Sequence, residues 1–184
     1  MVFDDHQIIQ RAVAGDPCAF TRLAEGVHGP LIGYLVRTVG NRPEVQDLGQ
    51  EVLLRVYRGI GRFDWRRAHF STWFFTIATN VCRDYLRRKK RFQGIADQIE
   101  PRPETAPLDL SPPNVAVRRD EIAGVEKALT QISDEQREVV VLRLYQGLTF
   151  REIGKVTGTS KDTAKSRMRY GLEKLRKILC EEDS

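Results

Sequence analysis

One stretch of this sequence, from Phe70 to Arg91, carries side chains that suit a separated nucleic-acid strand. It lacks Gly and Pro, and its apolar residues recur at helical spacing, which predicts a helix. The face opposite those apolar residues is one continuous stripe, made of Trp73, Thr76, Asn80, Arg83, Arg87 and Lys90. An unpaired base stacks on an aromatic plane and hydrogen-bonds to amide groups, while its phosphates attract Lys and Arg. The stripe therefore predicts a contact with an unpaired strand.

The same stripe has a simpler interpretation as an ordinary helix end. Trp73 would then be half-buried core, and cations near a helix C-terminus are favoured by the macrodipole. However, six of the nine residues from Arg83 to Arg91 are basic, and they continue a row that already holds Trp and Asn. This clustering favours nucleic-acid binding.

A basic loop leads into this helix. Its sequence from Gly61 to His69, G-R-F-D-W-R-R-A-H, places Phe63 and Trp65 among three arginines. Such aromatic residues either stack on unpaired bases or anchor the loop on the core, and for Phe63 we favour the anchoring role.

The segment from Pro43 to Ile60 is expected to form a helix with two distinct faces. The inward face is apolar and consists of Val45, Leu48, Val52 and Val56. The outward face consists of Asp47, Gln50, Glu51, Leu54 and Arg58. An exposed Leu within an acidic and polar face is typical of a protein-docking surface, but isolated surface leucines are also common. This helix alone leaves both interpretations open.

The composition narrows the class of protein. With 184 residues the chain suits one large or two small domains, and its net charge is +5 with a pI near 9.3. Its three cysteines have no metal-ligand spacing, which argues for a reduced, cytosolic setting without disulfides or zinc. No segment reads as a signal peptide or a membrane span. We therefore expect a cytoplasmic protein without a cofactor.

The whole chain is expected to be all-α, in two helical domains. Helices are predicted from Asp4 to Ala14 and again from Asp16-Pro17, with Gly26, Gly29 and Pro30 bending or breaking the second. The first domain spans residues 1–92. Residues 93–114 hold five prolines and four acidic residues, which predicts an extended linker to a second domain at 115–184.

The second domain carries a helix-turn-helix pattern. Capping boxes at Ser133 to Gln136 and Thr149 to Glu152 open two helices, and Gly158 ends the shorter one. A long final helix then buries Ala164, Met168, Gly171 and Leu175. The candidate DNA contacts are Arg151, Ser160, Lys161, Lys165, Ser166, Arg169 and Tyr170. Arg and Lys suit guanine edges in duplex DNA; an ordinary helical bundle with a polar outer face is the alternative.

These motifs resemble those of a known family. D-L-G-Q-E-V-L-L-R-V-Y-R (Asp47 to Arg58), F-S-T-W-F-F-T-I-A-T-N (Phe70 to Asn80) and D-Y-L-R-R-K-K-R (Asp84 to Arg91) resemble region 2 of the extracytoplasmic-function (ECF, group 4) bacterial sigma factors. L-T-F-R-E-I-G-K-V-T-G-T-S-K-D-T-A-K-S-R (Leu148 to Arg167) is similar to their region 4. The resemblance follows the family's order of motifs and, with the linker between them, extends over nearly the whole chain.

The resemblance implies a subunit that binds core RNA polymerase, through β′ and β, and directs it to promoter DNA. The Leu54 face matches the surface that docks on the β′ coiled coil. The Trp73 to Lys90 stripe and the preceding loop match the part that opens and holds the non-template strand of the −10 element. The final helix matches the reader of the −35 duplex, and the linker matches the segment threaded toward the RNA exit path. An anti-sigma partner is usual in the family.

Two positions depart from the family's pattern. Asp162 stands where Gly is frequent, and Ala164 stands where Val or Ile is frequent. Since Asp162 opposes phosphates, we expect a −35 sequence that differs from family norms.

Two other functions are alternatives to this one. A free-standing helix-turn-helix regulator would leave the Leu54 face and the stripe without a purpose. A metal-dependent nuclease would use Asp47, Glu51, Asp64 and Asp84, but no His joins these carboxylates.

Overall fold

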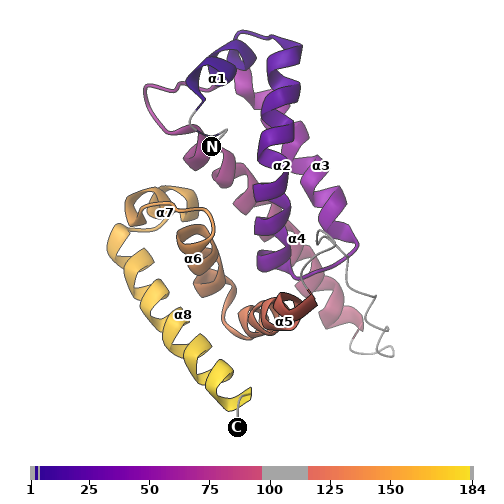
Figure 1. The fold of residues 1–184 in the computed structure, drawn as a ribbon, viewed down its shortest axis with the longest axis vertical. Helices are drawn as coiled ribbons and strands as arrows, with labels where there is room; N and C mark the ends of the chain where they lie inside the picture. The colour runs from indigo at the N-terminus through magenta and orange to yellow at the C-terminus, as the bar shows by residue number, and fades with distance from the viewer. Residues whose placement is uncertain (1–2, 4, 97–115, 183–184) are drawn as a thin grey trace. The chain divides into compact units, whose positions relative to one another are not determined.

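The computed structural model describes residue 3 and residues 5–96 and 116–182, and every regular element in these ranges is a helix, as predicted. The chain forms two compact units. The first holds α1 (His6–Val13), most of α2 (Pro17–Val39), α3 (Glu44–Gly59), η2 (Ile60–Arg62) and α4 (Phe70–Ala96). The second holds α5 (Ala116–Gln131), α6 (Asp134–Leu144), α7 (Phe150–Thr157) and α8 (Lys161–Glu182) (Figure 1).

Asp16 starts α2 at the corner after α1, as predicted. One of its carboxylate oxygens accepts the backbone N–H groups of Cys18 at 2.9 Å and Ala19 at 3.1 Å, and the other pairs with Arg11 at 2.6 Å. The hydrogen bond from Ala19 and the bond from Arg11 hold the pKa of the Asp16 carboxyl below its usual value. This carboxylate therefore satisfies two of the open N–H groups of the helix start.

Gly26, Gly29 and Pro30 were expected to bend or break α2, and a break is ruled out, since the helix continues from Pro17 to Val39 with Pro30 inside it. A proline in a helix interior costs about 3 kcal/mol through a lost hydrogen bond and a steric clash. Apolar burial along the helix offsets that cost. The residues of α2 that are at most 1% exposed are Leu23, Val27, Leu31, Tyr34 and Leu35.

The core of the first unit is built on aromatic residues of α4. Phe74 and Phe75 are buried, with ring centroids 5.3 Å apart and planes at 89°. The Tyr34 ring lies 5.3 Å from that of Phe75, and its hydroxyl hydrogen-bonds with the Thr79 hydroxyl at 2.8 Å. That bond satisfies both buried polar groups. α3 packs on α4, and its inward face is buried as predicted, at Val45, Leu48, Val52 and Val56.

Both predicted capping boxes are confirmed in the second unit. The Ser133 hydroxyl accepts the Gln136 N–H, and the Gln136 side chain accepts the Ser133 N–H. Thr149 and Glu152 form the same reciprocal pair at the start of α7. The starts of α6 and α7 are therefore fixed by bonds within single turns.

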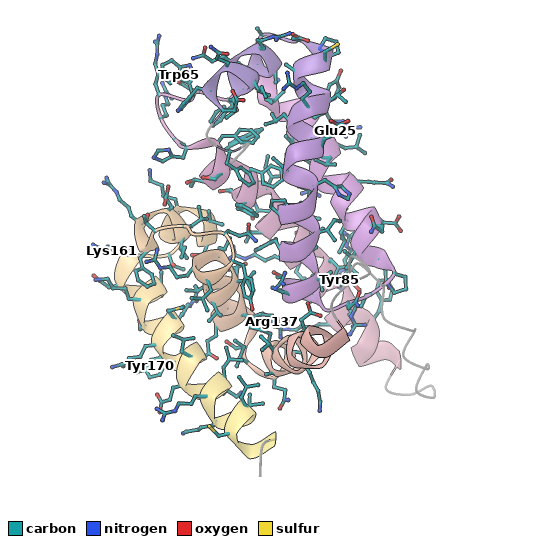
Figure 2. All side chains as sticks on the ribbon, viewed as in Figure 1. Glu25, Trp65, Tyr85, Arg137, Lys161 and Tyr170 are labelled. Atoms are coloured by element: carbon teal, nitrogen blue, oxygen red, sulfur yellow. The ribbon has the colours of Figure 1, made fainter. Side chains whose placement is uncertain are left out.

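Arg137 caps the end of α5 from the neighbouring helix α6. Its guanidinium donates to the carbonyl oxygens of Leu129 at 2.6 Å, Thr130 at 3.1 Å and Ile132 at 3.2 Å. Its side chain is 8% exposed and lies 3.6 Å from the Asp134 carboxylate. Figure 2 shows Arg137 beside the junction of α5 and α6. A buried cation thus satisfies carbonyls that a helix end leaves open.

α4 continues to Ala96, four residues into the predicted linker. The rest of that linker, residues 97–114, lies outside the described residues. Among the helices that the structure does describe, none is both long enough and apolar enough to cross a bilayer.

Candidate functional site

The outward face of α3 carries two exposed apolar side chains. Leu54 is 54% exposed and Tyr57, one turn further on, is 61% exposed. The Tyr57 ring packs edge-on against Phe20 of α2, with centroids 4.9 Å apart. The remaining residues of the predicted face are exposed or half-buried around Leu54, and they are Asp47, Gln50, Glu51 and Arg58. Tyr57 was not predicted to lie on this face, because nothing in the sequence distinguishes an exposed Tyr of a docking surface from one of an ordinary surface.

Arg55 links this face of α3 to α4. It pairs with Glu51 on its own helix, and its other terminal nitrogen lies 3.7 Å from the Asp84 carboxylate of α4. Asp84 also pairs with Arg87 at 3.0 Å. Four charges of alternating sign therefore run from α3 to the basic part of α4.

This arrangement does not support the nuclease alternative, whose metal ligands would be Asp47, Glu51, Asp64 and Asp84. Glu51 and Asp84 share the Arg55 guanidinium, and Asp64 pairs with Arg67 at 3.2 Å. In the described ranges no three His, Cys, Asp or Glu side chains converge as a metal ion would require.

The stripe on α4 is half-buried at its start and mostly exposed from Asn80 onward. Trp73, Thr76 and Arg83 are half-buried, and the Thr76 hydroxyl donates to the Thr72 carbonyl at 2.7 Å. The exposed members of the stripe are Asn80, Arg87 and Lys90. The amide and the cations at the outer end are therefore the accessible part.

Trp73 sits in an aromatic cluster at the edge of the core. Its ring centroid lies 5.1 Å from Phe63 and 5.7 Å from Phe70, and a Cβ added to Gly59 would come within 3.2 Å of the indole. Phe63 is 7% exposed, so it anchors the loop, as favoured from the sequence, and its ring is closed to a base. Trp73 keeps a partly exposed surface.

The loop before α4 presents Trp65 to solvent. The residue is 45% exposed, and the Arg66 guanidinium lies 5.4 Å from its ring centroid. Asp64 orders the loop by accepting the Arg66 N–H at 2.9 Å and pairing with Arg67. Figure 2 shows Trp65 at the outer edge of its unit. An exposed ring among cations suits stacking on an unpaired base.

The buried residues of α8 and its candidate DNA contacts lie on different faces of the helix. The buried residues are those predicted, namely Ala164, Met168, Gly171 and Leu175. The exposed candidates on α8 and at its start are Ser160, Lys161, Lys165, Arg169 and Tyr170, and Arg151 is exposed on α7. Lys161 and Tyr170 project outward from α8 in Figure 2. Asp162 has a 90% exposed side chain, 3.9 Å from the Lys165 ammonium.

Two serines of the candidate set are engaged by the backbone. The Ser160 hydroxyl accepts the Thr163 N–H at 3.0 Å, which makes it the N-cap of α8. The Ser166 hydroxyl donates to the Asp162 carbonyl at 2.7 Å, so its oxygen faces a ligand only as an acceptor.

Arg169 and Tyr170 form a local pair on the outer face of α8. An Arg169 terminal nitrogen donates to the Tyr170 hydroxyl at 3.0 Å, and the guanidinium lies 4.7 Å from the Tyr170 ring centroid. The aromatic ring thus orients the guanidinium before any ligand binds.

The turn between α7 and α8 depends on a close backbone approach at Gly154. Its carbonyl accepts the N–H groups of Gly158 and Thr159, the latter at 2.8 Å. A Cβ on Gly154 would lie 2.8 Å from the Thr159 carbonyl oxygen, a distance that real Cβ atoms essentially never show. Gly158 completes the turn with φ at +70°. Gly154 therefore fixes how α8 leaves α7.

We expect Gly154→Ala to lower the free energy of unfolding by about 1–3 kcal/mol, because overpacking against backbone outweighs the gain in helix propensity. Gly124→Ala in α5 is the matched control, since an added Cβ there meets nothing within 4 Å. That control should raise the free energy of unfolding by about 0.5–1 kcal/mol. Denaturant unfolding measures both, and equal stabilisation of the two variants would contradict the tight turn.

Two domain families match the chain. Sigma-70 region 2 matches residues 23–92, and Sigma-70, region 4 matches residues 128–177. The first match covers α3, the Trp65 loop and most of α4. The second covers α6, α7 and most of α8.

Several characterised proteins are similar over most of the chain. The RNA polymerase sigma-H factor of Pseudomonas aeruginosa is 31% identical, across 95% of this chain and 93% of that protein. RNA polymerase sigma factor CarQ of Myxococcus xanthus is 36% identical, across 84% of this chain and 86% of CarQ. ECF RNA polymerase sigma factor SigW of Bacillus subtilis is 29% identical, across 93% of this chain and 94% of SigW.

Two solved structures share the fold. The sigma factor RpoE, in complex with the anti-sigma factor NepR from Bartonella quintana, has a TM-score of 0.70 at 20% identity, covering 87% of this chain and 96% of that one. CnrH, in complex with the cytosolic domain of CnrY, has a TM-score of 0.70 at 25% identity, covering 98% and 99%.

Proposed function

The chain belongs to the extracytoplasmic-function group of the sigma-70 family, and from this premise we propose how its surfaces divide the work of promoter recognition. It is a promoter-specificity factor that binds core RNA polymerase and promoter DNA, and it is not an enzyme. The observation that carries the proposal is that three exposed surfaces of different chemistry fall within the two matched regions.

The outward face of α3 docks on the polymerase. Its support is the exposed apolar pair of Leu54 and Tyr57 inside a face that is otherwise polar and charged. Apolar anchors ringed by polar groups are the usual centre of a protein interface. Through the family resemblance, the partner surface is the β′ coiled coil.

The loop and the stripe of α4 open the −10 element and hold its non-template strand. Trp65 and Trp73 offer ring surfaces, Asn80 and Thr76 offer polar groups, and the phosphates lie along the cations Arg83, Arg87 and Lys90. The exposure of Asn80, Arg87 and Lys90 supports this assignment. Phe63 serves by anchoring the loop.

The outer face of α8 reads the −35 element in duplex form. Lys165, Ser166, Arg169 and Tyr170 face the base edges, while Arg151, Ser160 and Lys161 lie near the phosphates at the start of the helix. Support comes from the exposure of this face and from the helix-turn-helix geometry that presents it.

Arg169→Ala should cost about 1–3 kcal/mol at the −35 element and relax the preference for one base pair. Arg176→Ala is the charge-matched control, because Arg176 is exposed on α8 beyond the readout turns. Competition between promoter variants for each reconstituted holoenzyme measures the preference. Equal preferences for Arg169→Ala and the native chain would argue against readout there.

Run-off transcription with core polymerase on fragments of the source genome tests the function as a whole. We expect specific transcripts whose upstream sequences share two elements, which would also reveal the recognised promoter. A gel shift with the chain alone separates the alternative: a free-standing helix-turn-helix regulator binds promoter duplex tightly without polymerase, whereas this proposal requires the polymerase.

We also propose an anti-sigma partner and action in the bacterial cytoplasm. RpoE and CnrH are seen bound to NepR and to the cytosolic domain of CnrY respectively. The similar sigma factors come from bacteria, whose RNA polymerase works in the cytoplasm. We propose that residues 1–92 serve the polymerase and −10 functions and that residues 115–184 serve the −35 function.

A further inference from the structure

Arg55 and Asp84 are not among the proposed contact residues, yet they join the two proposed surfaces of the first unit. Glu51 belongs to the docking face of α3, and Arg87 belongs to the strand-holding stripe of α4. Between them, Arg55 pairs with Glu51 and lies 3.7 Å from Asp84, which pairs with Arg87 at 3.0 Å. We call the set Glu51, Arg55, Asp84 and Arg87 the ion-pair chain.

The two middle residues of the ion-pair chain, Arg55 and Asp84, each interact with two partners. Arg55 uses Nη2 toward Glu51 and Nη1 toward Asp84. Asp84 uses Oδ2 toward Arg55 and Oδ1 to accept a hydrogen bond from Arg87 Nη2. Because the partners are shared, the neighbouring pairs are energetically coupled.

The distances show which pairs dominate in the chain by itself. Arg55 is hydrogen-bonded to Glu51 but lies 3.7 Å from the Asp84 carboxylate. The closer partner of Asp84 is Arg87, at 3.0 Å. Arg87 has a 72% exposed side chain, yet its charge is compensated. One cation of the proposed strand contact is therefore partly neutralised within the chain.

We propose that Arg55 and Asp84 are positioning residues that restrain Arg87 in the isolated chain and release it when polymerase covers Glu51. The inference rests on the proposed docking face. A polymerase group that binds Glu51 leaves Arg55 without its near partner, and Arg55 then turns to Asp84. The carboxylate attracts Arg87 less, and Arg87 reaches a phosphate of the opened strand. Exposed ion pairs are individually weak, so the restraint is a several-fold bias and not a block.

The test uses the full chain without polymerase and a fluorescent single-stranded oligothymidylate, with anisotropy recorded over a range of salt concentrations. Asp84→Asn should bind about two- to fivefold more tightly at low salt, the range expected for one exposed ion pair. Its log–log salt dependence should steepen by up to about 0.7, the value for one further phosphate contact on a single strand. A purely structural role of Asp84 would not raise affinity.

Glu44→Gln is the matched control, because it removes the same charge from an exposed residue of α3 outside the ion-pair chain. Its gain should stay below about 1.5-fold, the low end of an exposed charge effect, since Glu44 is outside the ion pairs that restrain Arg87. Glu51→Gln should raise affinity in the native background and add nothing once Asp84→Asn is present. Arg87→Gln should cancel the gain of Asp84→Asn.

Equal gains for Asp84→Asn and Glu44→Gln, or additive gains for Asp84→Asn and Glu51→Gln, would overturn the inference. Thermal unfolding checks each variant. If Asp84→Asn fails to fold, Glu51→Gln against Glu44→Gln carries the same comparison, because Glu51 bonds to Arg55 on its own helix.

The outcome separates this inference from the proposed function. The oligothymidylate measurement contains no polymerase, so it tests the restraint alone. In complex with core polymerase, Asp84→Asn and the native chain should hold the −10 strand within about 1.5-fold of each other, far less than the one-pair gain expected of the isolated chain. A persisting gain there would show that polymerase does not release Arg87, even if docking on α3 is upheld.

Discussion

Leu54→Asp is expected to abolish copurification of the chain with core RNA polymerase. Leu54 is 54% exposed at the middle of the polar face of α3, so it is placed to insert into a partner. A hot-spot residue at the centre of an interface contributes about 2 kcal/mol or more, and a carboxylate buried there without a counter-charge adds a desolvation penalty. The combined loss exceeds about 30-fold in affinity, since 1.4 kcal/mol is tenfold.

The change at Leu54 should leave the fold intact, because substitutions at exposed sites usually alter stability by no more than about 0.5 kcal/mol. Leu172→Asp makes the same chemical change at a residue of α8 that is 42% exposed, and it should copurify normally. Pull-down with core polymerase and thermal unfolding of both variants give the answer. A normal pull-down for Leu54→Asp would remove this face of α3 from the docking proposal.

Asn80→Ala combined with Arg83→Ala is expected to impair promoter opening while polymerase binding persists. Asn80 is an exposed amide on the stripe of α4, and Arg83 follows it along the same face. Loss of an amide contact to a base costs about 1–3 kcal/mol, and loss of a phosphate contact weakens binding further. The captured strand should therefore be held at least about fivefold less well.

Permanganate reactivity of unpaired thymines in the −10 element measures the opening directly. Arg22→Ala is a control for lost charge, because Arg22 is exposed on α2, outside both proposed surfaces. Binding of each variant to core polymerase is measured in parallel. A decrease in polymerase binding as large as the decrease in opening would show that the stripe has been assigned the wrong role.

Features that depend on bonds within one turn could be predicted from the sequence. The capping boxes at Ser133 and Thr149 join residues three apart, so the letters alone specify the donors and acceptors. The buried and exposed faces of α3 were predicted for a similar reason, since helical periodicity assigns each residue to one side. The exposure of Leu54 follows from that periodicity.

Features that depend on how separate segments meet could not be predicted. Pro30 stays inside α2 because tertiary burial outweighs a local cost. The capping role of Arg137 requires its side chain to reach back across a turn to α5. The Arg55–Asp84 approach requires the packing of α3 on α4. The anchoring of Phe63 was favoured from the sequence, but the rings that bury it come from a different segment, α4.

The separation of inner and outer residues on α8 has a consequence for evolution. Ala164 and Met168 hold the helix in its domain, while Lys165, Arg169 and Tyr170 lie in solvent and stabilise nothing in the interior. Mutations on the solvent side can therefore accumulate at little cost to folding. A duplicated gene for such a protein can drift toward a new set of target genes while its scaffold stays unchanged.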